Sequence, residues 1–274
     1  METVSEDTAV RPQTLMLNFF GLYLLGRDVA VSATSVIDVF ARAGVSEHAA
    51  RSTLTRMVNR GLLVRQRHGR AMYFGLTERS ERILRDGETR LWKTSPVNDD
   101  WDGVWTLLGF SLPESWQKQR HELRAQLGWA GFGPLFNGLW IAPGHAEVAE
   151  IVGSLGLESH VKVFHAETVP GTDVDQMIQE TWDVGAVAAR YNAFLERWRE
   201  PGGEDGRDPL AVKLLLACDW LQVIRADPRL PAVHLPAGWP AATADARFRH
   251  VDGLVVAAAA RIAEQLMDVR PLLP

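Results

Sequence analysis

Hydrophobic and polar side chains alternate with a helical period along residues 46–59. At about 100° per residue, Ala50, Leu54 and Met57 fall on one side of the helix. The opposite side is polar and consists of His48, Arg51, Ser52, Thr55, Arg56 and Asn59. Ser46 is a good N-cap, and Gly61 follows the last turn, where a positive φ often ends a helix. The pattern predicts an amphipathic helix that carries arginines on its exposed face.

Two more helical patterns precede this segment. Residues 13–25 have an apolar face that includes Leu17, Phe20 and Leu24. Residues 34–43 have another, made of Val36, Ile37, Val39 and Phe40. A short turn, Ala43-Gly44-Val45, leads from there to Ser46. The order predicted is therefore helix, tight turn and polar-faced helix.

A basic hairpin is predicted directly after these helices. Residues 63–67 and 70–76 have strand patterns, and His68-Gly69 can form the turn because Gly accepts positive φ freely and His tolerates it. Residues 46–72 hold six arginines and one acid, Glu47, which gives a local charge of +5.

Arginines on a helix are often only solvated surface, but the order of elements favours a winged helix-turn-helix that binds DNA. The helix would enter the major groove and present His48, Arg51, Ser52, Thr55 and Arg56 to base edges. The phosphates would be bound by Arg60, Arg65, Arg67 and Arg70. The partner expected is a double-stranded DNA operator.

The middle of the chain predicts a different architecture. Thr77 can cap a helix that runs to about residue 93, and the polar, proline-containing residues 94–100 suit a linker. Strands are then predicted at 104–110, 132–136, 139–142 and 161–165, with Asn137-Gly138 as a hairpin turn. Helices are predicted at 114–127, with Pro113 in the first turn, and at 145–155. This β-α-β-β-α-β order is that of a split ferredoxin-like domain.

The last hundred residues have helical patterns. Helices are predicted at 184–198, 210–226 and about 246–267, with a glycine-rich break at 202–206 and a proline-rich segment between Pro228 and Pro240. The chain is thus expected to be an α+β protein with a disordered N-terminus (1–13), a winged-helix domain (14–93), a linker (94–100), a ferredoxin-like domain (101–172) and a helical effector and dimerisation domain (173–274).

Composition narrows the class of protein. A chain of 274 residues suits two or three domains, and no apolar run reaches the roughly 18 residues that span a bilayer. The polar N-terminus lacks the features of a signal peptide, so a cytoplasmic protein without membrane association is expected. Cys218 is the one cysteine, which excludes an intrachain disulfide, and its apolar neighbours predict a core position.

Charge is divided unevenly along the chain. Residues 1–93 carry a net charge of +4 (14 Lys+Arg, 10 Asp+Glu), and the remaining residues carry a net charge of −9 (15 Lys+Arg, 24 Asp+Glu).

The sequence offers little catalytic chemistry. The eight histidines are scattered, and His160 and His165 approach a metal-ligand spacing without a third ligand beside them. A phosphate-binding loop and a nucleophile elbow are both missing from the sequence. We expect that the protein is not an enzyme and that it binds no cofactor and no metal ion. Two alternatives stay open: a metal-dependent nuclease that uses the ferredoxin-like domain, and an RNA-binding protein.

Several motifs, in the same order, resemble the PaaX-like family, the phenylacetic acid degradation repressors of bacteria. They are GVSEHAARSTLTRMVNRGLLVRQRHGRAMYFGLTERS, WDGVWTLLGFSLPE, GFGPLFNGLWIAP and IRADPRLPAVHLPAGWP. The resemblance covers about residues 14–267. It implies a winged helix, a middle domain similar to a small CRISPR-associated nuclease subunit, and a helical C-terminal domain. It also implies a homodimer that represses catabolic genes until a small effector, often an aromatic acyl-CoA, releases it.

The nuclease activity of that group is not expected here. In the group, an Asp near the end of the first strand supports metal-dependent cleavage. The corresponding strand here ends Leu108-Gly109-Phe110, and Asp102 lies at its beginning. Metal-assisted hydrolysis needs a carboxylate to hold the ion.

Candidate effector residues lie in the C-terminal part. Trp220 and Trp239 could flank an aromatic or acyl group, although most tryptophans serve as core. The phosphates of a CoA-type ligand would need cations, and the candidates are Arg190, Arg197, Arg225 and Arg229.

Overall fold

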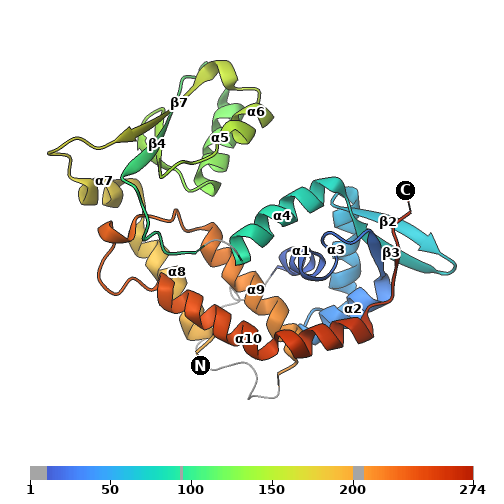
Figure 1. Cartoon of the computed structure of the whole chain (residues 1–274). Coiled ribbons are helices and arrows are strands. Elements are labelled where there is room, and N and C mark those ends of the chain that lie inside the picture. The colour runs from blue at the N-terminus through green and yellow to red at the C-terminus, as the bar shows by residue number, and fades with distance from the viewer. Residues whose placement is uncertain (1–10, 93–94, 200–206, 274) are drawn as a thin grey trace, which may run out of the picture. The chain divides into compact units, whose positions relative to one another are not determined.

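The computed structural model describes residues 11–92, 95–199 and 207–273 of the chain. It is an α+β structure with two four-stranded sheets (Figure 1). Backbone contacts divide it into two compact units. The first unit comprises residues 1–94, 194–222 and 246–274, and the second comprises residues 95–193 and 223–245. The predicted disordered segment falls outside the described residues except for its last three positions, and the glycine-rich break at 202–206 lies wholly outside them.

Four helices of the first unit confirm predictions, three of them made from hydrophobic spacing and the fourth, α4, from the Thr77 cap. They are α1 (Pro12–Tyr23), α2 (Ala33–Arg42), α3 (Glu47–Asn59) and α4 (Glu78–Trp92). The hydroxyl oxygens of Ser32 and Ser46 accept the N–H groups of Ser35 and Ala49, which caps α2 and α3. Thr77 accepts the N–H of Ser80 in the same way, as predicted for the start of α4.

Apolar side chains of α1, α2 and α3 form one core. Ala50, Leu54 and Met57 of α3 are buried in it, as their spacing predicts. The predicted face of α1 was partly wrong, because Leu17 is only half-buried while Leu15 and Phe19 are fully buried. Residues 15–17 are all apolar, so the period alone leaves the orientation of this helix open.

The hairpin consists of β2 (Leu63–His68) and β3 (Ala71–Leu76). His68 pairs with Ala71, so the two turn residues are Gly69 and Arg70, and the predicted His68-Gly69 turn was wrong by one position. Gly69 has a φ of 60°, which suits the first central residue of a type II′ hairpin turn. The prediction placed the single glycine at the second position of the turn instead.

Two short strands of this sheet were missed by the sequence patterns. β1 (Val29–Ser32) pairs with β3 on one side and with β8 (Val269–Pro271) on the other, so the sheet order is β2-β3-β1-β8. Figure 1 shows the C-terminus beside the hairpin sheet. The first and last strands of the described chain therefore lie side by side in one sheet.

The core of the first unit also includes side chains from far along the chain. They come from α9 (Pro209–Arg225) and α10 (Ala241–Leu266), and include Leu210, Leu214 and Cys218. Cys218 is fully buried, which confirms its predicted core position. The start of α10 was predicted five residues too late, because the helix begins directly after Pro240.

The second unit contains the predicted β-α-β-β-α-β order. Its strands are β4 (Val104–Phe110), β5 (Gly133–Phe136), β6 (Leu139–Pro143) and β7 (Val161–Glu167), in the antiparallel order β5-β6-β4-β7. The intervening helices, α5 (Gln117–Trp129) and α6 (Ala149–Ser154), begin three and four residues later than predicted. For α5 the reason is a turn, in which the Trp116 N–H donates to the Pro113 carbonyl at 3.0 Å.

The remaining elements of the described chain are short or helical. They are α7 (Val174–Thr181), α8 (Val184–Arg197), and the 3-10 helices η2 (Glu158–His160) and η3 (Ala232–His234). None of the helices described is long and apolar enough to cross a membrane.

Candidate nucleic-acid interface

The polar side of α3 is a surface of the first unit. His48, Arg51, Thr55 and Arg56 are exposed, and Ser52 is half-buried. The structure thus places the five predicted base-contacting residues on one helix, opposite its buried side. These five roles stay predictions.

Thr53 supports this surface and was missed by the sequence patterns. It is fully buried, and its hydroxyl oxygen accepts a hydrogen bond from Nη2 of Arg56 at 3.0 Å. Because Thr53 is buried and cannot move freely, this bond restrains the position of the Arg56 guanidinium. The helical period could have identified Thr53, since it lies next to Leu54 and one turn from Ala50 and Met57.

Arg51 is held by partners within its own helix. Its Nε donates to Glu47 Oε1 at 2.8 Å, and its carbonyl accepts the Thr55 hydroxyl at 3.0 Å. Both side chains of the ion pair are more than half exposed, so the pair contributes only about 0.3–0.5 kcal/mol. The guanidinium can therefore leave Glu47 for a base or a phosphate at little cost.

Arg60 forms the C-cap of α3 and is bound to two other helices. Its Nη1 donates to Gln13 Oε1 of α1 at 2.8 Å, and its carbonyl accepts Nη1 of Arg79 from α4 at 3.2 Å. The guanidinium is exposed at the end of the polar helix face. Gln13 and Arg79 were not among the predicted site residues, because only tertiary packing brings them here.

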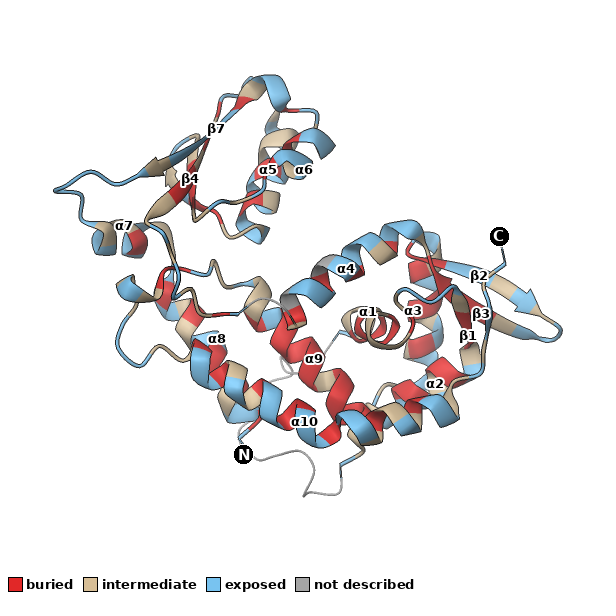
Figure 2. Cartoon of the chain, viewed as in Figure 1, coloured by how far each residue is buried: buried red, intermediate tan, exposed pale blue. Residues whose placement is uncertain are grey.

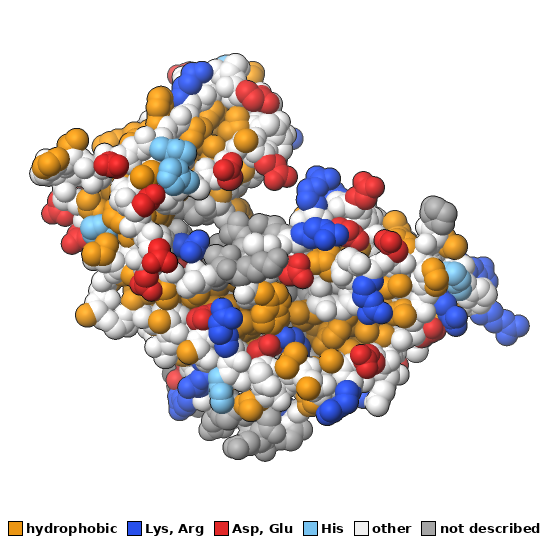
Figure 3. Space-filling model, in the orientation of Figure 1, with side chains coloured by type: hydrophobic (Ala, Val, Ile, Leu, Met, Phe, Trp, Pro, Cys, Tyr) orange, Lys and Arg blue, Asp and Glu red, His pale blue; other side chains and the backbone are white. Residues whose placement is uncertain are grey.

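The hairpin carries the remaining predicted residues. Arg65 and Arg67 lie on the same side of β2, since side chains alternate along a strand, and Arg70 lies in the turn. All three are exposed, and the Nε of Arg67 donates to the Gly69 carbonyl at 2.9 Å. Figure 2 shows an exposed hairpin tip that projects away from a largely buried base, and Figure 3 shows basic side chains gathered around that tip. The nine predicted DNA-binding residues thus lie on two adjacent elements of one unit.

The predicted effector residues are divided between the two units. Trp220 belongs to the core of the first unit, where its ring stacks on Phe248 with centroids 5.1 Å apart, and Arg197 pairs with Asp219 there at 3.0 Å. The second unit contains Arg190, Arg225, Arg229 and Trp239. The structure does not bring the six together within one unit, and the effector set stays a prediction.

A polar cluster of the second unit escaped the sequence patterns. The buried Tyr191 donates its hydroxyl to Asp227, whose other oxygen accepts the Arg229 N–H at 2.7 Å. Burial raises the pKa of Asp227 even though these hydrogen bonds lower it, and burial together with the Asp227 charge raises the pKa of Tyr191. Arg229 has a φ of 56° and donates its Nε to the Ser95 carbonyl at 3.0 Å. This cluster fixes the start of the proline-rich segment.

In the second unit, the carboxylate nearest the first strand lies before the strand and not at its end. Asp102 lies before β4 and accepts the Val104 N–H at 3.1 Å, whereas β4 ends Leu108-Gly109-Phe110 without a carboxylate. Nδ1 of His145 lies 3.2 Å from Nδ1 of His165, and its Nε2 lies 3.4 Å from Asp102. Across the described ranges, no group of three or more His, Cys, Asp or Glu side chains could hold a metal ion.

Comparison with known proteins finds the PaaX-like family, which the sequence motifs resemble, over most of the chain. Three family models match: the PaaX-like protein model at residues 11–80, the PaaX protein central Cas2-like domain at 98–178, and the PaaX-like protein C-terminal domain at 182–265. The chain is 27% identical over 245 residues to the transcriptional repressor PaaX of Escherichia coli (strain K12), covering 84% of this chain and 76% of that protein.

A solved structure shares the fold. The uncharacterized protein Rv0674 from Mycobacterium tuberculosis matches with a TM-score of 0.63 and 21% identity, over 94% of this chain and 98% of that one. With the three matching family models in their expected order, the chain belongs to the PaaX-like family of transcriptional regulators.

Proposed function

We propose that this chain is a DNA-binding transcriptional repressor, and that residues 14–93 act as its winged helix-turn-helix. The observation that carries the proposal is the exposed basic surface of α3 and the β2–β3 hairpin, in a chain related to a known repressor. The element order α2, turn, α3 and two-stranded hairpin is what such a domain requires.

The two elements divide the work of DNA binding. The major groove is about 12 Å wide and admits one helix, so α3 enters it with His48, Arg51, Ser52, Thr55 and Arg56 toward the base edges. Arg60 at the helix end and Arg65, Arg67 and Arg70 on the hairpin bind phosphates, which fix the register but carry no sequence information.

The other parts of the chain supply assembly and control. Residues 101–172 form a ferredoxin-like domain, supported by the observed element and strand order, and residues 173–274 form the effector and dimerisation domain. As a homodimer, the protein would bind two half-sites one helical turn apart. The target is an operon for the breakdown of an aromatic compound, and an aromatic acyl-CoA or related effector releases the repressor.

The proposal is tested by two arginine variants that should fail differently. Arg51→Ala should relax the preference at one base position and cost about 1–3 kcal/mol there. Arg67→Ala should weaken binding to all sequences about equally and reduce the slope of log K against log [salt] by about 1. The measurement is fluorescence anisotropy on a duplex selected from random DNA by the wild-type protein.

Two results would contradict the proposal. One is equal affinity of both variants and the wild type for the selected duplex. The other is preferential binding of duplex RNA over duplex DNA in direct competition, which would favour an RNA-binding protein. Incubation with labelled strands and Mg²⁺ or Mn²⁺ serves as the control for cleavage, since a repressor leaves the strands intact.

A further inference from the structure

The segment that follows α10 completes the hairpin sheet. β8 pairs with β1 in the register Val29↔Pro271, Ala30↔Arg270 and Val31↔Val269. Two more backbone hydrogen bonds extend this pairing, from the Ser32 N–H to the Asp268 carbonyl and from the Leu272 N–H to the Asp28 carbonyl, both 2.9 Å long. β1 is therefore paired along both edges.

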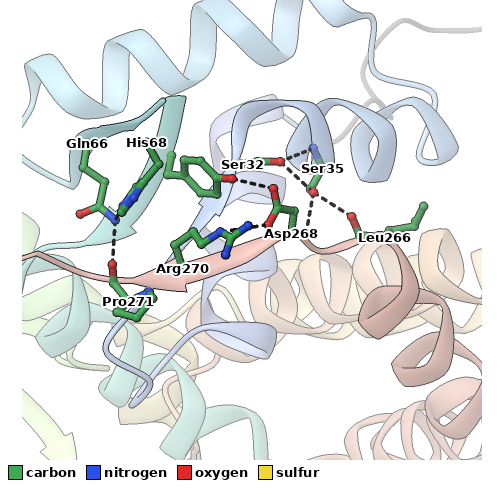
Figure 4. A network of polar contacts seen from close by, with 9 residues as sticks. Ser32, Ser35, Gln66, His68, Leu266, Asp268, Arg270 and Pro271 are labelled. Carbon is green, nitrogen blue, oxygen red and sulfur yellow. Dashed lines mark hydrogen bonds and ion pairs between the residues drawn. The ribbon is translucent and has the colours of Figure 1, made fainter. Parts of the chain in front are cut away.

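The start of the C-terminal segment, here residues 268–273, is anchored to α2. The buried Ser35 donates its hydroxyl to the Leu266 carbonyl at 2.7 Å and accepts the Asp268 N–H at 3.0 Å. Asp268 also accepts the Tyr73 hydroxyl of β3 at 2.6 Å and lies 3.6 Å from Nε of Arg270 (Figure 4). The segment thus leaves α10 at a fixed point beside the hairpin.

The end of the segment contacts β2 through one side chain, Gln66. Its Nε2 donates to the Pro271 carbonyl at 3.0 Å (Figure 4). Its Oε1 accepts the Leu273 N–H at 2.9 Å. The same Nε2 lies 3.0 Å from Nε2 of His68. The Gln66 amide therefore both donates a hydrogen bond to the backbone of the C-terminal segment and accepts one from it.

Gln66 lies between the two arginines of β2 but on the other side of the strand. Side chains alternate along β2, so Arg65 and Arg67 share one side, and Gln66 and His68 share the opposite one. Tyr73 and Gly75 of β3 are on the side of Gln66, since cross-strand partners point the same way. A Cβ on Gly75 would lie 2.6 Å from Leu272 Cδ1, so this glycine lets the segment approach closely.

We propose that residues 268–273 are a positioning element for DNA binding, which holds the β2–β3 hairpin from behind so that Arg65 and Arg67 meet the phosphates. The inference rests on the proposed function. A two-stranded hairpin is marginally stable alone, and β1 pairs with β3 only at Tyr73, Phe74 and Gly75, so the tip of the hairpin lies beyond that pairing. The bonds to Gln66 fix the strand at the position between the two arginines.

The test uses the full chain with Gln66→Ala, and a second variant that ends at Pro271. The probe is a random-sequence DNA duplex of about 30 base pairs, because phosphate contacts do not depend on sequence. Each variant should bind about three- to tenfold more weakly, with a smaller salt slope. Hydrogen exchange at the β2 and β3 amides should be faster. Gln179→Ala, at an exposed glutamine of α7, is the matched control and should change none of these.

Double variants identify the route of the effect. If the segment acts through the hairpin, Gln66→Ala should add little to the Arg65→Ala/Arg67→Ala protein, in which Arg70 is the one hairpin arginine left. It should keep its full effect beside Arg51→Ala. In the chain that ends at Pro271, the hydrogen bond between Gln66 and Leu273 is already lost. Gln66→Ala should therefore reduce DNA affinity less there than in the full chain. Full additivity with the hairpin arginines, or wild-type affinity of both variants, would overturn the inference. If Arg65→Ala/Arg67→Ala itself binds like the wild type, the proposed function of the hairpin is what fails.

Discussion

At the scale of single residues, the core of the first unit contains an ion pair. Lys213 of α9 is bonded to Asp252 of α10, and both side chains are almost completely buried. The Lys213 ammonium also lies 4.5 Å from the centroid of the Trp92 ring, which adds a cation–π contact. The pair therefore joins two helices of the unit at a desolvated point.

Lys213→Met should destabilise the protein by about 3–5 kcal/mol, because it leaves the Asp252 carboxylate buried without its cation. Urea unfolding of the full chain measures this change. Arg85→Met breaks an exposed pair with Glu81 and should cost less than about 1 kcal/mol. Equal losses from the two substitutions would show that the buried position of Lys213 does not matter.

Individual site residues were predictable where one helix decides their position. The exposed His48, Arg51, Thr55 and Arg56 follow from the period of α3, and so does the buried Leu54. The pairing of Tyr191 with Asp227 was not predictable, because these residues lie on different elements and meet only through tertiary packing. The same reason applies to Gln13 beside Arg60.

At the scale of elements, the start of α3 depends on its cap. Ser46→Ala removes the oxygen that accepts the Ala49 N–H and should cost about 1 kcal/mol of stability. It should also weaken DNA binding, since the frayed turn carries His48. Thermal unfolding and anisotropy measure the two effects. Ser154→Ala, at an exposed serine near the end of α6, is the control and should stay within about 0.5 kcal/mol. The cap would be unimportant if both serines behaved alike.

Apart from α7, which was missed, the helices were predicted to within five residues because their signals are local: the apolar period, the capping side chains and the prolines. Strands β1 and β8 gave no such signal, since they are four and three residues long. What makes them strands is pairing with segments far away in the sequence, β1 with β3 and with β8, which no local pattern contains. The hairpin turn was displaced by one residue because Gly69 suits either central position until the register is known.

At the scale of the whole molecule, the predicted winged-helix domain of residues 14–93 makes up only part of its compact unit. The first unit adds residues 194–222 and 246–274 to it, and the core includes Leu210, Leu214, Cys218, Ala259 and Ala263 from α9 and α10. Nδ2 of Asn18 in α1 donates to Sγ of Cys218 at 3.1 Å, which marks this packing. The boundary after residue 93 is visible in the sequence as a change of composition, but the packing across the chain is not.

A fragment of residues 1–94 should therefore be much less stable than the full chain. Burial of one leucine contributes about 1.5–3 kcal/mol, so loss of Leu210 and Leu214 alone approaches the 5–15 kcal/mol that stabilise a typical domain. The fragment also lacks β8, which leaves one edge of β1 unpaired. Circular dichroism melting and the dispersion of amide NMR signals would measure the difference. A fusion of residues 1–94 to 246–274 restores β8 and the α10 contacts and should recover part of the stability, whereas a fusion to residues 223–245 should not. If the bare fragment melted at the temperature of the full chain, the N-terminal segment would be a self-contained domain, and the packing of α9 and α10 against it would contribute nothing to its stability.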